Sequence, residues 1–176
     1  MALAPLATTT ELAAWMQVDA SALPAGASAV LTMVSAIVRR EARQRFTLGT
    51  TTVKLYPRDG YVTPPQRPVR SVVSVLDADG APVEYELRRD RLYLARLCTA
   101  VSVTYTHGYE ETPGDVLAVV LSAAQRVLGN PRDLRQETVG SQSVTYAAET
   151  IGASLSQADK DMLRTYRRGA AMVAMG

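Results

Sequence analysis

The stretch from Val101 to Pro131 constrains the fold more than any other part of this 176-residue sequence. Val101, Val103 and Tyr105 alternate with hydroxyl-bearing residues, which is the period-two pattern of a strand with one covered face. The segment 116–128 that follows has only three polar side chains. A helix that is apolar on nearly every side has to be buried on most sides. The stretch therefore predicts a buried strand, a turn and a central apolar helix that forms the middle of the core.

Capping chemistry defines the ends of this predicted helix. Thr112 is expected to cap its start, with Pro113 at the first helical position. The run Gly129-Asn130-Pro131 is expected to stop it. The segment is shorter than the roughly 20 apolar residues that span a bilayer, so no membrane partner is expected.

Composition excludes several classes of protein. A hydrophobic fraction of 47% indicates a globular chain and not a disordered one. The net charge of +2 is too small for a dedicated nucleic-acid binder. The lone Cys98 has no internal disulfide partner, and we expect a packed thiol there.

The sequence before residue 48 predicts helices. Thr8 and Glu11 fit a capping box on a short first helix. A longer helix is expected over 27–45, because apolar residues recur there at helical spacing. Four arginines fall in its last turns: Arg39, Arg40, Arg43 and Arg45. We interpret them as favourable to the helix dipole and solvated, with a phosphate or carboxylate contact as the alternative.

The middle of the chain has the periodicity of strands. Strands are expected at 53–56, 69–76, 83–87, 91–94 and 101–106, and the short connections between them favour antiparallel pairing. The run Asp77-Ala78-Asp79-Gly80 resembles the start of a calcium loop, but the later ligands and the closing Glu are missing. We therefore predict a hairpin turn there and no metal site.

The end of the sequence predicts one more helix. Ser141 to Tyr146 is a candidate short strand in a polar stretch. Ser156 can cap a last helix, which we expect to end near Gly169. The uncharged tail 170–176 is expected to dock on a partner, with folding back or fraying as the alternative.

These elements predict an α+β fold: a helical bundle around a central apolar helix, with an inserted small, mostly antiparallel β-sheet. The whole chain 1–176 is expected to be one domain. Its segments are N-terminal helices (1–48), a β-rich insertion (49–108), the central helix (109–131), a loop with a short strand (132–155), and the C-terminal helix and tail (156–176).

Catalysis has little support in the sequence. His107 beside a glycine turn, with Glu110 and Glu111 close by, is the only candidate arrangement. A lone histidine at a strand end is usually a surface or capping residue, and acid–base chemistry needs partners within reach. No Gly-rich phosphate loop, HExxH motif or nucleophile elbow is present. We expect no enzyme, no catalytic residue and no cofactor.

The order of the pieces resembles the head-to-tail connector (adaptor) family of tailed bacteriophages. The most distinctive part is Val103 to Tyr109 followed by Pro113 to Val116. The other matching pieces, in chain order, are 6–13, 34–39, 65–72, Asn130-Pro131, 155–159 and Tyr166-Arg167.

The resemblance implies a structural protein of the virion neck, between capsid and tail, that is made in the host cytoplasm. Members dock as a ring under the portal protein, usually in twelve copies, extend the channel through which double-stranded DNA passes, and meet a tail-side stopper or completion protein. The alternative is another neck or tail-completion protein, such as a stopper or tail terminator. The C-terminal region often contacts the portal, so the candidate interface residues are Met162, Tyr166, Arg167, Arg168, Met172, Val173 and Met175.

Overall fold

The computed structural model describes residues 3–129 and 155–167 with their side chains, and 136–139 and 142–145 by their backbone. The chain divides into two compact units. The helical unit comprises Met1–Arg43 and Thr112–Gly176, and the sheet unit comprises Gln44–Glu111. That the two units together make one domain stays a prediction.

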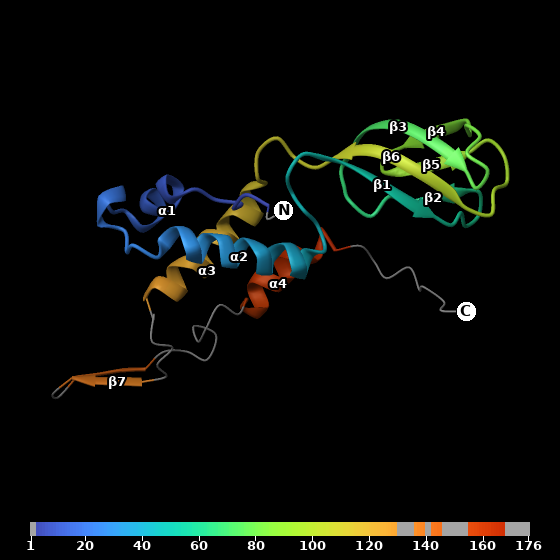
Figure 1. The fold of residues 1–176 in the computed structure, drawn as a ribbon. Coiled ribbons are helices and arrows are strands. Elements are labelled where there is room, and N and C mark those ends of the chain that lie inside the picture. Colours follow the sequence, from blue (N-terminus) through green and yellow to red (C-terminus); the bar gives the residue numbers. More distant parts are fainter. Residues whose placement is uncertain (1–2, 130–135, 140–141, 146–154, 168–176) are drawn as a thin grey trace. The chain divides into compact units, whose positions relative to one another are not determined.

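The helical unit contains four α-helices within its described residues (Figure 1). They are α1 (Thr9–Met16), α2 (Ala27–Ala42), α3 (Gly114–Gly129) and α4 (Gln157–Arg164), with a short 3₁₀ turn, η1 (Ala20–Ala22), between the first two.

Two of the predicted helix starts are confirmed by reciprocal capping bonds. The Thr8 hydroxyl accepts from the backbone N–H of Glu11 at 3.2 Å, and the Glu11 carboxylate accepts from the Thr8 N–H at 2.6 Å. Ser156 and Asp159 form the same box at the start of α4. Each box satisfies N–H groups that the first helical turn leaves without a partner.

Three other predicted helix boundaries are wrong. α4 ends at Arg164 and not near Gly169, because Thr165 already caps it, so Arg167 does not lie in its last turn. α2 ends at Ala42, because Arg43 has a left-handed backbone with φ of 55°, so Arg43 and Arg45 do not lie in its last turn. Thr112 does not cap α3, which starts at Gly114. Its hydroxyl instead donates to the carbonyl of Leu6 at 2.9 Å. A contact between residues so distant in sequence outweighs the local capping preference.

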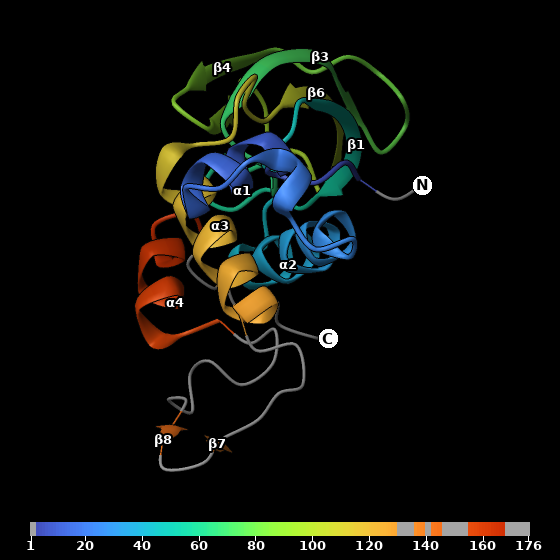
Figure 2. The same cartoon turned by 90° about the vertical axis from the view of Figure 1, so that its left-hand side faces the viewer.

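Helix α3 contacts each of the other three helices (Figure 2). Its buried residues are Val116, Val119, Val120, Leu121, Ala123 and Ala124. Helix α2 also contacts the other three, and it buries Leu31, Val34 and Val38. Because both helices share this position, the expectation of one central apolar helix stays a prediction.

The sheet unit contains two antiparallel three-stranded sheets, ordered β1-β6-β3 and β2-β5-β4 (Figure 1). The strands are β1 (Gly49–Leu55), β2 (Tyr61–Val62), β3 (Val69–Asp77), β4 (Tyr85–Arg88), β5 (Arg91–Leu94) and β6 (Val101–His107).

The two sheets share one apolar core. β6 alternates strictly, with Val101, Val103 and Tyr105 inside and the residues between them half-buried. Leu92 and Val62 of the other sheet belong to the same buried cluster. Fully burying a side chain such as Val or Leu contributes roughly 1.5–3 kcal/mol, so this shared cluster joins the sheets.

The α+β class is confirmed, but the single inserted sheet is a correction: the described residues of this unit form two sheets. β2 has only two residues, which is too short for an alternating pattern, and it becomes a strand by pairing with Leu92 and Tyr93. Outside this unit, β7 (Gln136–Val139) pairs with β8 (Gln142–Thr145), so the strand expected near 141–146 has a partner that the sequence did not indicate.

Candidate partner-binding surfaces

Helix α4, which carries Met162 of the predicted interface, is held in place by a buried ion pair. Leu163 is completely buried, and the Asp159 carboxylate lies 2.5 Å from the Arg126 guanidinium of α3. The side chain of Asp159 is 5% exposed and that of Arg126 is 21% exposed. Both charges are thus largely removed from water and depend on each other for compensation.

Two predicted interface residues, Tyr166 and Arg167, bond the segment after α4 to the other helices. The Tyr166 hydroxyl donates to Asp115 at 2.7 Å, at the start of α3. The Arg167 guanidinium donates to the carbonyl of Glu41 at 3.0 Å and pairs with the Glu41 carboxylate at the end of α2. These bonds hold the segment directly after α4 against both larger helices.

Of the remaining predicted interface residues, only Met162 lies in the part of the chain that the structure describes. Met162 is 42% exposed, so it offers an apolar side chain at the surface of α4. Arg168, Met172, Val173 and Met175 lie outside the described residues.

The outer face of the sheet β1-β6-β3 is rich in hydroxyl groups. Cross-strand register places Thr50, Thr106 and Ser71 in one row, and Thr52, Thr104 and Ser74 in the next. The hydroxyls of Thr52 and Thr104 are hydrogen-bonded at 2.8 Å, and those of Ser71 and Thr106 at 2.6 Å. The third row holds Lys54, Ser102 and Leu76, so the only ionic group of these rows is one ammonium.

The other sheet presents an arginine–tyrosine stack that the sequence analysis did not single out. The Arg88 guanidinium lies 5.0 Å from the centre of the Tyr93 ring, and Arg91 lies 4.9 Å from that of Tyr61. The two rings are 5.4 Å apart. The alternation Arg91-Leu92-Tyr93, with Leu92 buried, is the sequence signal that could have placed both ends of β5 on the outer face.

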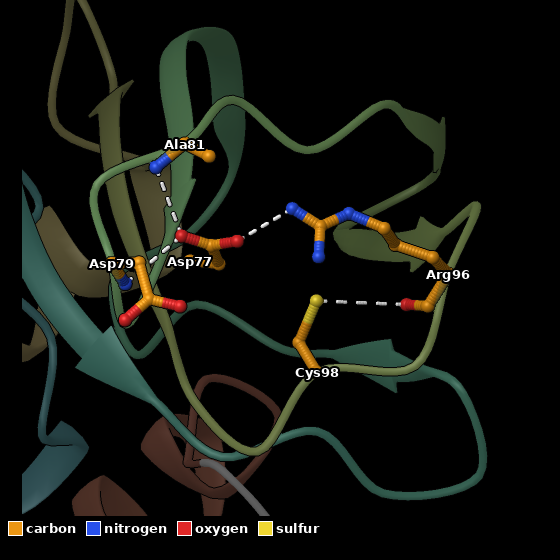
Figure 3. A network of polar contacts seen from close by, with 5 residues as sticks. All are labelled: Asp77, Asp79, Ala81, Arg96 and Cys98. Atoms are coloured by element: carbon orange, nitrogen blue, oxygen red, sulfur yellow. Dashed lines mark hydrogen bonds and ion pairs between the residues drawn. The ribbon is translucent and has the colours of Figure 1, made fainter.

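The predicted turn at Asp77 is confirmed, and the Asp77 carboxylate is bonded within it (Figure 3). The Asp77 carboxylate accepts from the backbone N–H groups of Asp79 at 3.0 Å and Ala81 at 2.9 Å, and from Arg96 at 2.5 Å. The hydrogen bond from Arg96, together with the backbone donors, holds the pKa of Asp77 below its ordinary value. Within the described residues, no group of three or more candidate ligands could hold a metal ion.

Cys98 packs beside this turn, partly buried against the shared core of the sheets. Its Sγ lies 3.7 Å from the carbonyl oxygen of Arg96 (Figure 3). The expectation of a packed thiol is confirmed.

His107 is buried, which corrects the expectation of a surface or capping residue. It is 1% exposed, its Nε2 is 2.9 Å from the Thr51 hydroxyl, and its ring lies 5.4 Å from that of Tyr105. Glu110 instead pairs with Arg70 at 3.2 Å, beside a shallow hollow on the sheet unit. Among the described residues no carboxylate bonds to His107, so the geometry offers no acid–base pair there.

Burial of His107 predicts a loss of stability in mild acid. Burial, reinforced by the positive charge of Arg45, lowers the imidazole pKa below its ordinary 6.5. Below pH 6.5 the unfolded chain therefore binds more protons than the folded chain, and the free energy of unfolding falls as pH falls toward the lowered pKa. The fall is at most about 1.4 kcal/mol per pH unit. More than about one pH unit above 6.5, where the unfolded imidazole is also neutral, this group contributes almost no pH dependence.

Urea unfolding at pH 7.5 and pH 5.5 measures this effect. The midpoint should fall in acid for the wild type and stay nearly constant for His107→Gln, whose amide can still bond to Thr51. This window lies above the acid titration of the carboxylates. Equal acid sensitivity in both proteins would contradict the assignment to His107.

Comparisons with known proteins find likeness in fold. No protein-family model matches the sequence. No curated protein matches it either. One similar solved structure is the neck of an empty gene transfer agent particle, computed with C6 symmetry. The two chains are 15% identical, the match covers 98% of this chain and 96% of that chain, and the TM-score is 0.56. Another is the virion of a native gene transfer agent particle, with 16% identity, coverage of 96% and 92%, and a TM-score of 0.55.

No helix in the described part of the chain is both long enough and apolar enough to cross a membrane.

Proposed function

We propose that this protein is a structural subunit of the neck of a tailed phage or phage-like particle, in the role of head-to-tail connector (adaptor). The observation that carries the proposal is a fold shared over 98% of this chain with a protein of a particle neck. A match over nearly the full length of both chains relates the whole subunit, helices and sheets together, and not one common motif.

In this role the subunit acts by assembly and not by catalysis. Copies of the chain form a ring, which we expect to hold twelve, beneath the portal protein and above a tail-side completion protein. The ring extends the channel for double-stranded DNA. A net charge of +2 suits a conduit, since many phosphate contacts would bind passing DNA strongly at low salt.

The choice of adaptor over stopper or tail terminator rests on the helical unit. We expect the alternatives to be richer in β-structure, whereas four α-helices in the described residues, two of them of 16 residues, form a unit of their own here. That unit also carries α4, which we propose as the portal-facing element, with Met162 at its surface.

Electron microscopy of the purified chain mixed with its cognate portal tests this proposal. Rings on the narrow end of the portal are the expected result. Binding to the far side of an already formed adaptor ring would instead assign a stopper role. A chain that decorates neither assembly would contradict a neck function.

Deleting residues 169–176 tests whether the apolar tail docks on the portal. We expect the truncated chain to keep its fold, because Tyr166 and Arg167 retain their bonds to Asp115 and Glu41. We expect it to lose most portal decoration in the same imaging experiment. Decoration equal to that of the full chain, with an unchanged circular dichroism spectrum, would remove the tail from the interface.

A further inference from the structure

The arginine–tyrosine stack has two ends that differ in one respect. At the Arg88 end, the Nε and Nη2 groups donate to the two Glu86 carboxylate oxygens at 2.8 Å and 2.7 Å. The guanidinium is thus stacked on Tyr93 and closed by a bidentate carboxylate. At the Arg91 end, the guanidinium stacks on Tyr61, but no carboxylate among the described residues pairs with it.

Cross-strand register places all five side chains on one face. Glu86 and Tyr61 both lie opposite Tyr93, and Arg88 lies opposite Arg91. Leu92 between them points to the core and is completely buried. Because strands alternate, the stack belongs to the outer face, where Arg91 is exposed.

The open end fits a carboxylate from a protein better than a DNA phosphate. A guanidinium held flat on a ring keeps its planar fork available for a bidentate acceptor. The exposed Glu86 would repel a polyanion. Arginine and tyrosine are the residue types enriched where proteins meet.

The helical unit contains a carboxylate that matches this end. Among the side chains that the structure describes in this unit, that of Asp19 is the one carboxylate without a hydrogen-bond or ion-pair partner. The side chains that accept a hydrogen bond or form an ion pair are Glu11, Glu41, Asp115, Asp159 and Asp161. Asp19 makes no cap bond to η1. It follows Val18, which is 40% exposed, and stands near Trp15, which is 44% exposed.

We propose that Arg91 of one copy binds Asp19 of the next copy, so that the stack on the sheet unit and the segment after α1 form the two halves of a repeated contact. Two different patches that complement each other generate a head-to-tail interface, which closes into a ring when the rotation between copies allows it. The inference rests on the proposed ring and names the residues that join its subunits.

Charge reversal at two matched positions tests the contact. Arg91→Glu should reduce ring formation on the portal by at least about tenfold, because it places two carboxylates together. Lys54→Glu makes the same change of charge on the hydroxyl-rich sheet and should leave rings intact. The double variant Arg91→Glu with Asp19→Arg should restore them. Rings from Arg91→Glu alone, or a block by Lys54→Glu only, would overturn the proposal.

A zero-length cross-link identifies the partner directly. Lys54 and Lys160 are the only lysines of the chain, so Arg91→Lys adds a single new amine for carbodiimide coupling to a touching carboxylate. The expected product is a covalent dimer, absent from the treated wild type, whose linked peptides contain positions 91 and 19. Linkage to the portal, to another carboxylate, or no new product in formed rings would overturn the pairing.

The same samples separate this inference from the proposed function. Wild-type chain that stays monomeric with the portal present would overturn both. Rings that form normally from every Arg91 variant would overturn only the Arg91–Asp19 contact.

Discussion

Replacing Gly108 by alanine should unfold the sheet unit. Gly108 has φ of 98°, where residues with a Cβ are strained. A Cβ at this position would lie 2.1 Å from the carbonyl oxygen of Thr47 and 2.6 Å from its carbon. Both are backbone atoms, so no rotamer change can relieve the overlap.

The expected penalty is large because several segments meet at this glycine. Its N–H donates to the carbonyl of Pro68 at 3.1 Å, and the following N–H, of Tyr109, donates to Phe46 at 3.3 Å. Moving Thr47 away from a new Cβ would disturb these bonds. We expect a loss of more than about 4 kcal/mol, which is exceptional for one substitution and comparable with the whole stability of many domains.

Gly80→Ala is the matched control. Gly80 also has a positive φ, of 84°, but a Cβ there would meet nothing within 4 Å. Only the conformational penalty of about 1–2 kcal/mol should remain. Urea unfolding followed by circular dichroism compares the two variants. Similar losses would show that the close approach of Thr47 can relax, and would contradict the argument.

The contrast between these two glycines shows what sequence can predict. A turn at Asp77-Ala78-Asp79-Gly80 follows from local chemistry, since the Asp77 side chain bonds to N–H groups two and four residues on. The glycine after His107 also suggests a turn, but its contact with Thr47 depends on a segment about sixty residues away. Such contacts exist only once the fold has formed.

The same division separates the confirmed helix boundaries from the wrong ones. Thr8 and Ser156 cap through residues three positions on, and both were predictable. Thr112 carries equal capping propensity but bonds to Leu6, and Arg43 adopts a left-handed backbone that its residue type disfavours. In both cases the contacts and geometry of the folded unit override a local preference.

The candidate surfaces divide in the same way. The sequence shows which residue types are present. It does not show that Arg88, Tyr93, Tyr61 and Arg91 stack together, because this depends on how three strands pair, and one of them has only two residues. The bonds that Tyr166 and Arg167 make with α3 and α2 were equally unpredictable from sequence, because their partners lie 51 and 126 residues away along the chain.

Replacing Asp159 by alanine should release α4 from the helical unit and with it the proposed portal contact. Two losses combine at this residue. The capping bond between Asp159 and the Ser156 N–H disappears, which costs about 1 kcal/mol. The Arg126 guanidinium, 21% exposed, also loses the carboxylate that compensates its burial. Stranding a fully buried charge costs about 3–5 kcal/mol, so the partial exposure of Arg126 places the sum near 3–4 kcal/mol.

Two variants on the same helix separate these terms and link them to assembly. Asp159→Asn keeps an acceptor for the Ser156 N–H but removes the charge, so it should lose most of the ion-pair term and little of the cap. Asp161→Ala breaks an exposed pair with Arg164, whose atoms are 3.8 Å apart, and should change stability by less than about 0.5 kcal/mol. Hydrogen exchange across 155–167 should rise strongly for Asp159→Ala, modestly for Asp159→Asn and hardly for Asp161→Ala. Portal decoration should fall in the same order. If α4 exchanges freely while decoration stays complete, then α4 does not have to be docked on α3 for the subunit to bind its portal, and the portal-facing element lies elsewhere in the chain.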